Sequence, residues 1–182
     1  KYDFQVLSPS FPLIISPGDP EQTVTIQCTP HLNAGIGLRT ATLELSSNDP
    51  KYLIPTYSLQ CMGTQPRYSS IPAPNRTLKF GSSEVGKPLT LELSIAEIGN
   101  AALEVSLDTI SGTNASEFKV LSPTFPLTIP DGGSTQKVTL QCTPADAGLR
   151  TATLKLRSND PNILTPTYAL ECTGLPAPPP VG

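Results

Sequence analysis

The chain has 182 residues and a formal net charge of −3, so it has room for one or two domains with modest cores. This charge gives no electrostatic reason to expect nucleic acid or an anionic membrane surface as a partner. Charged residues make up 15% of the chain and aromatic residues 5%, beside 21 prolines and 13 glycines. Such a composition favours short strands joined by turns over long helices. No apolar run approaches the roughly 20 residues of a membrane span, so membrane insertion is not expected and any export signal would lie outside these residues.

One stretch of the chain occurs twice. Residues 4–63 and 118–174 share the motifs VLSP, FPL, LRTATL, SNDP and PTY in the same order. The offset between the copies is 114 residues at the start and 111 after a length change near His31. A period of this size corresponds to one whole domain rather than to a short solenoid unit.

The first copy is predicted to be incomplete. Residues 1–63 contain no counterparts of residues 77–110, which are expected to form three strands, including the most hydrophobic one. A sandwich without these strands would expose its core and an open sheet edge. Either the chain is a fragment of a longer protein, or another chain supplies the strands. Residues 64–74 are predicted to be a proline-containing linker.

The second copy supplies enough strands for a complete domain, predicted over residues 75–174 and followed by a proline-rich tail at 175–182. About seven strands in ~100 residues is the pattern of an antiparallel β-sandwich. The predicted fold class is therefore all-β, with tandem immunoglobulin-like antiparallel β-sandwiches of which the first lacks its N-terminal strands. Alternation of apolar and polar residues predicts the side chains that face the core. They are Leu89, Leu91, Leu93, Ile95, Leu103, Val105, Leu107, Thr109, Ala152, Leu154 and Leu156.

Each copy contains one pair of cysteines. Cys28 and Cys61 are 33 residues apart, and Cys142 and Cys172 are 30 apart. Because side chains alternate between the faces of a strand, each thiol is expected to point inward. A disulfide across the core is therefore predicted within each copy, and each bond should stabilise the fold by about 3–4 kcal/mol. Oxidised cysteines would indicate an exported protein, extracellular or at the cell surface. The alternative is four buried free thiols in a reducing cytosol; zinc is disfavoured because no ligand pair is closely spaced.

Three segments of the second copy carry a family resemblance. FGSSEVGKPLTLELSIAEIGNAALEV, SGTNASEF and AGLRTATLKLRSNDP resemble the repeat of bacterial choice-of-anchor D proteins, relatives of the ASPM–SPD-2–Hydin immunoglobulin-like domains. The resemblance covers residues 75–174 and, in truncated form, 4–63. It implies an immunoglobulin-like sandwich, often in tandem, on large exported bacterial proteins, and it implies no catalytic residues. The paired cysteines and Ala96-Glu-Ile depart from the family pattern.

No catalytic, cofactor-binding or metal-binding residue is predicted. The single histidine, His31, lies in an expected loop without a nucleophile motif beside it. The repeated Asn-Asp-Pro motif at 48–50 and 159–161 could offer oxygens to calcium, but a turn is the favoured interpretation. Asn75 and Asn114 begin glycosylation sequons, which matter only in a eukaryotic secretory pathway. Acidic residues that could serve glycoside hydrolysis are spread along outward or turn positions: Glu92, Glu97, Glu104 and Asp108.

The sequence therefore favours a non-catalytic structural repeat module of an exported surface protein, such as a stalk, adhesin or filament. Its expected partners are neighbouring repeats or other copies of the protein, which could complete the first copy by strand complementation. A cell-surface or matrix ligand is a further expected partner. The alternatives are a carbohydrate- or ligand-binding module and an accessory domain of a larger extracellular enzyme, although the absence of tryptophan leaves a sugar-stacking surface poorly supplied.

Overall fold

A computed structural model describes residues 3–30 and 36–176, and the chain divides into two compact units, Lys1–Thr64 and Gln65–Gly182. Regular structure in the described residues consists of β-strands and one short 3-10 helix, η2 (Ala115–Glu117). None of these residues forms a helix long and apolar enough to cross a membrane.

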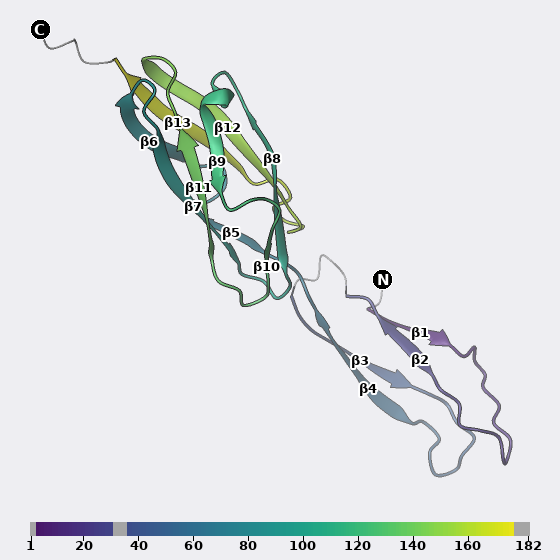
Figure 1. The fold of residues 1–182 in the computed structure, drawn as a ribbon. Helices are drawn as coiled ribbons and strands as arrows, with labels where there is room; N and C mark the ends of the chain where they lie inside the picture. Colours follow the sequence, from purple (N-terminus) through teal and green to yellow (C-terminus); the bar gives the residue numbers. More distant parts are fainter. Residues whose placement is uncertain (1–2, 31–35, 177–182) are drawn as a thin grey trace, which may run out of the picture. The chain divides into compact units, whose positions relative to one another are not determined.

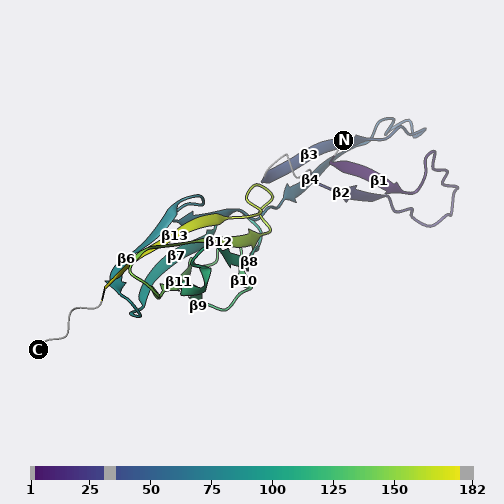
Figure 2. The ribbon, with the colours of Figure 1, turned by 90° about the horizontal axis from the view of Figure 1, so that it is seen from above.

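The second unit is a two-layer β-sandwich of immunoglobulin-like architecture (Figure 1). One sheet has the strand order β10-β8-β12-β13-β6 and the other has the order β5-β7-β11-β9. Figure 2 shows β12 and β13 of the first sheet lying over β7 and β11 of the second. The strands are β5 (Tyr68–Ile71), β6 (Thr77–Glu84), β7 (Leu89–Glu97), β8 (Leu103–Ser111), β9 (Phe118–Ser122), β10 (Leu127–Ile129), β11 (Gln136–Cys142), β12 (Gly148–Ser158) and β13 (Thr167–Leu175).

Alternating apolar residues of both sheets fill the space between the layers. Leu93 and Ile95 on β7 and Leu154 and Leu156 on β12 are all 0% exposed, as their alternation predicts. Burying each such side chain contributes about 1.5–3 kcal/mol. The core of the second unit is therefore built from the pattern that is visible in the sequence.

The second unit begins earlier in the chain than the repeat pattern predicts. Within the segment expected to be a linker, residues 68–71 form β5, which pairs antiparallel with the end of β7. Tyr68 is 4% exposed, and Gln65 accepts a backbone hydrogen bond from Asn100. Serines and prolines conceal this strand in the sequence, because they carry little strand propensity and its burial comes from tertiary contacts. The domain boundary is corrected from residue 75 to residue 65.

Strand β8 also differs from its predicted pattern. Leu107 was expected to face the core, with Thr109, but Leu107 is 40% exposed. A β-bulge displaces Thr109: Lys155 pairs with Thr109 and the next residue of β12, Leu156, pairs with Leu107, so one residue of β8 is unpaired. Leu107 itself lies opposite Leu156, which is 0% exposed, and lines an open groove with Val120 and Phe125. The alternation reverses beyond the bulge, and Ile110 packs against the core instead.

The five-stranded sheet is not wholly antiparallel. Strand β6 runs parallel to β13 at the edge of the sheet and continues to Glu84. Strands β5 and β6 follow one another in the chain but belong to different sheets. Strand β6 therefore pairs with β13, which is distant in sequence, and not with a hairpin neighbour. Sequence signals for hairpins predict antiparallel strand pairs and so do not predict the parallel pairing of β6 with β13.

The first unit contains two separate two-stranded antiparallel sheets (Figure 1). Strand β1 (Phe4–Ser8) pairs with β2 (Thr25–Cys28), and β3 (Gly37–Glu44) pairs with β4 (Thr56–Gly63). By sequence these strands are the counterparts of β9, β11, β12 and β13. The described part of this unit holds no counterparts of β5 to β8, and none of its described hydrophobic side chains is buried.

Candidate functional site

Both disulfides join the cysteines that were paired from the sequence. Cys142 on β11 and Cys172 on β13 belong to opposite sheets, so their bond crosses the core of the second unit. Their Cα atoms are 6.6 Å apart, as are those of Cys28 and Cys61 in the first unit. Each bond therefore ties together two sheets that share no backbone hydrogen bonds.

An ion pair between Glu117 and Arg150 links helix η2 to strand β12 in the second unit. The guanidinium of Arg150 donates to both carboxylate oxygens of Glu117, at 2.6 Å from Nη2 to Oε1 and 3.0 Å from Nε to Oε2. Their side chains are 16% and 8% exposed. Hydrogen bonding to Arg150 holds the pKa of Glu117 below its ordinary value. The counterparts in the first unit, Asp3 and Arg39, approach to 4.0 Å.

The repeated Asn-Asp-Pro motif has a structural role in the second unit. Asp160 is 2% exposed, and its carboxylate accepts hydrogen bonds from the backbone N–H groups of Tyr68 at 2.7 Å and Asn162 at 2.8 Å. It thereby ties the turn after β12 to strand β5. In the first unit Asp49 is exposed and accepts from the N–H of Lys51 at 2.8 Å. Among the residues that the structure describes, no group of three metal-ligating side chains could hold an ion.

Three buried hydroxyl groups form a chain of hydrogen bonds between the two sheets. The oxygens of Tyr68 and Tyr168 are 2.8 Å apart, and Tyr168 lies 2.6 Å from Ser70 Oγ. Ser70 donates its proton to the carbonyl of Pro72, so Tyr168 donates to Ser70 and Tyr68 donates to Tyr168. Burial raises the pKa of both phenols above the ordinary value. Every hydroxyl proton in this cluster is therefore used in a hydrogen bond within the fold.

The acidic residues considered for hydrolysis are not brought together. Glu92 forms an exposed ion pair with Lys137 at 2.9 Å, and Asp108 pairs with Arg157 at 2.7 Å. Glu97 accepts hydrogen bonds from the backbone N–H groups of Gly99 and Arg67. Each of these carboxylates thus has its own local partner.

The two asparagines that begin glycosylation sequons both lie in the described part of the chain. Asn75 is exposed at a positive φ of 64°, which fits a turn. Asn114 accepts a hydrogen bond from the N–H of Thr151 at 3.0 Å, so its amide takes part in the fold. His31 lies outside the described residues.

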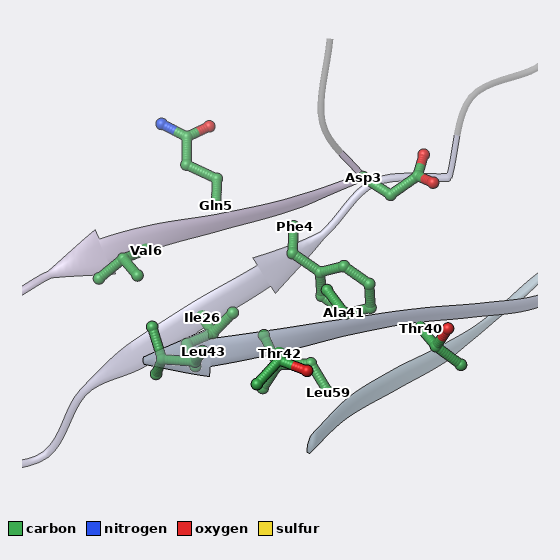
Figure 3. A pocket seen from close by; sticks show the side chains of 10 residues that line it. All are labelled: Asp3, Phe4, Gln5, Val6, Ile26, Thr40, Ala41, Thr42, Leu43 and Leu59. Carbon is green, nitrogen blue, oxygen red and sulfur yellow. The ribbon is translucent and has the colours of Figure 1, made fainter. Parts of the chain in front are cut away.

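Two partly apolar grooves lie on the first unit. A groove of about 930 Å³ runs beside residues 11–15 and 43–48, and a smaller one of about 420 Å³ lies between β1, β2 and β3. In the smaller groove the side chains of Phe4, Ile26 and Leu43 lie toward one another, whereas Gln5 points away (Figure 3). The sequence predicted that this face would be open but did not show where its groove lies.

Comparison with known proteins yields no family and no curated relative: no family model and no curated protein matches the chain. Among solved structures, an ASH / PapD-like domain of human CEP192 matches with a TM-score of 0.48 at 16% identity, covering 63% of this chain and 88% of that one. A protein of unknown function from Porphyromonas gingivalis W83 matches with a TM-score of 0.47 at 15% identity, covering 95% and 86%. The Vibrio cholerae VesB protease matches with a TM-score of 0.40 at 13% identity, covering 70% and 40%. At these values the likeness concerns the fold and says nothing about activity.

Proposed function

We propose that this chain is a non-catalytic structural repeat module of an exported bacterial surface protein, such as a stalk, an adhesin or an extracellular filament. The observation that carries the proposal is that one disulfide-bridged half-sandwich occurs twice in the chain. In its complete form the buried polar groups serve the fold itself: Asp160 binds backbone amides, and Tyr168 binds other hydroxyl groups. The resemblance of the motifs to choice-of-anchor D repeats supports the same function.

The location follows from the cysteines. Described residues contain no free cysteine, and paired cysteines indicate an oxidising compartment. We place the protein outside the cell or at its surface, where a disulfide-crosslinked sandwich keeps its shape under load and proteolysis. Its proposed partners are neighbouring repeats arranged in tandem, or other copies of the protein that complete the first unit by adding strands.

Cell fractionation combined with thiol alkylation tests this proposal. The native protein is expected in the extracellular or surface fraction, with no thiol alkylated under denaturation until a reductant is added. The control is the same protein produced in a reducing cytosol, in which all four thiols should react. A cytosolic native protein with reactive thiols would contradict the proposed location, and specific binding to a glycan array would favour a carbohydrate-recognition module instead.

A further inference from the structure

Strands β6 and β13, near the entry and the exit of the chain in the second unit, lie side by side (Figure 1). They pair in parallel over seven residue pairs, from Thr77 opposite Ala169 to Glu84 opposite Leu175. In a parallel pair both strands run the same way, so the start of one lies beside the start of the other. The chain that leads into β6 and the chain that leaves β13 are therefore at opposite ends of the same ladder.

This arrangement decides how tension along the chain acts on the ladder. Pulling the chain before Thr77 away from the chain after Leu175 drives the two strands in opposite directions along their own axes. Every hydrogen bond between them is then loaded at the same time. In a hairpin that is pulled at its open end, by contrast, the strands separate sideways and the bonds break one after another. The parallel ladder therefore resists tension in the direction of the chain.

The segment that leads to β6 has a separate and smaller anchor. Strand β5 pairs with the end of β7 over four residue pairs. Two carboxylates hold the start of β5: that of Asp160 accepts a hydrogen bond from the N–H of Tyr68 at 2.7 Å, and that of Glu97 accepts one from the N–H of Arg67 at 3.1 Å. Because four pairs share a load less widely than seven, β5 should detach before the β6–β13 ladder opens.

The disulfide of the second unit holds β13 at the end where tension arrives. Cys172 lies close to the end of β13, and its bond leads to Cys142 at the end of β11 in the opposite sheet. Tension that reaches Leu175 therefore passes through covalent bonds to both sheets. The bond also keeps residues 143–171 closed when the other strands separate.

We propose that the β6–β13 ladder is the contact that resists tension along the chain in the second unit, and that β5 is released ahead of it. The inference rests on the proposed function of a structural module and deepens it by naming the strands that bear the load. The unit should then open in two steps. Release of β5 should lengthen the chain by roughly 30 Å, and shearing of the ladder by roughly 200 Å, because the bond between Cys142 and Cys172 keeps residues 143–171 closed.

Single-molecule pulling of the full oxidised chain in two geometries tests the proposal. With handles at the two ends of the chain the ladder is sheared, and the long step should follow the short one at a higher force. In the second geometry the N-terminal handle moves to position 87, through an azide-bearing residue in place of Lys87. Lys87 is exposed and follows β6 closely, and nearby the N–H of Val85 donates to the carbonyl of Leu175 at 3.0 Å. The same ladder is then pulled open from one end, so its opening force should be several-fold lower. Equal opening forces in the two geometries would overturn the proposal.

Two matched substitutions separate mechanical resistance from stability. Leu78 on β6 is 1% exposed and Leu103 on β8 is 0% exposed, so alanine at either position leaves a cavity in the same core. Leu78→Ala loosens a sheared strand and should lower the force of the long step. Leu103→Ala should change that force little, because β8 pairs with neither β6 nor β13. An equal or larger loss of force in Leu103→Ala would overturn the proposal.

The order of release has its own variant. Asp160→Asn replaces one carboxylate oxygen beside the start of β5 by an amide group, which cannot accept both hydrogen bonds. It should lower the force of the short step and leave the long step unchanged, and a weaker long step would overturn the assigned order. None of these measurements depends on the cellular location or on the compartment that oxidises the cysteines. A failure of the proposed function would therefore appear in the fractionation, and a failure of this inference in the pulling geometry.

Discussion

Tyr57 and Tyr168 stand at the same position of the repeat, yet 52% of Tyr57 is exposed and Tyr168 is 0% exposed. The difference comes from β5, which supplies Tyr68 and Ser70 as hydrogen-bond partners in the second unit. Identical residues thus have different energetic roles according to which strands cover them.

Removing the hydroxyl group of Tyr168 or of Tyr57 should change stability to different extents. Tyr168→Phe leaves Tyr68 without its acceptor and Ser70 without its donor, so it should destabilise the second unit by about 1–3 kcal/mol. Tyr57→Phe should change the stability by less than about 0.5 kcal/mol, because its hydroxyl lies on an exposed side chain. Denaturant unfolding followed by NMR signals of each unit would measure both. Equal effects would show that the buried hydroxyl chain contributes nothing.

Glu117 gives the second unit an acid-sensitive contact. Because its pKa is lowered in the folded state by the bond from Arg150, its contribution is present above the unfolded pKa of about 4.3 and is lost as pH falls through the folded pKa. Glu117→Gln should therefore be less stable than the native chain at neutral pH, with the difference shrinking toward low pH. Asp108→Asn is the control, since it removes an ion pair in which Arg157 is 69% exposed. Thermal unfolding at a series of pH values measures both variants, and a pH-independent deficit for Glu117→Gln would contradict the assignment.

At the scale of single strands, the equivalent strands β11 and β2 differ in how far their side chains are buried. Leu140 on β11 is 1% exposed between two sheets, whereas Ile26, its counterpart on β2, lines the open groove of the first unit. The same strand sequence is therefore a core element in one unit and part of an open surface in the other.

Alanine substitution should reproduce this difference. Leu140→Ala leaves a cavity between two packed sheets and should cost about 2–5 kcal/mol. Ile26→Ala should cost less than about 1 kcal/mol, because solvent already reaches this site and no closed cavity forms. Hydrogen exchange of each unit reports the two values separately.

For the whole molecule, the disulfides limit how far the chain can be stretched. The bond from Cys142 to Cys172 shortcuts 30 residues and the bond from Cys28 to Cys61 shortcuts 33. This is the behaviour expected of a load-bearing module, because the chain between bridged cysteines cannot extend after the sheets separate.

Single-molecule pulling measures the effect directly. Reduction should lengthen the fully extended chain by about 100 Å for each bond, from about 3.3–3.6 Å per residue. Replacing Cys142 and Cys172 by serine should give the increment of that bond without reductant, while the other bond should still require reductant. An extension that is unchanged by reductant would contradict the pairing.

Much of the second unit could be predicted from its residues. The alternation along β7 and β12 is regular, and burial on one face is enough to determine which side chains point inward. The parity of Cys142 and Cys172 likewise predicted a bond between the sheets. The prediction failed at β5 and at the bulge in β8, where the relevant signal is a partner strand distant in sequence: β7 for β5 and β12 for β8.

The sequence by itself determined that the chain is all-β, that a stretch of it occurs twice, that each copy contains one cysteine pair and that residues 1–63 contain no counterparts of residues 77–110. These properties follow from local periodicity and from comparison of the chain with itself. Only the tertiary structure decided that β5 belongs to the second unit and that β6 runs parallel to β13. The physical reason is that sheet edges are defined by strand order, and strand order brings together segments that no local pattern links.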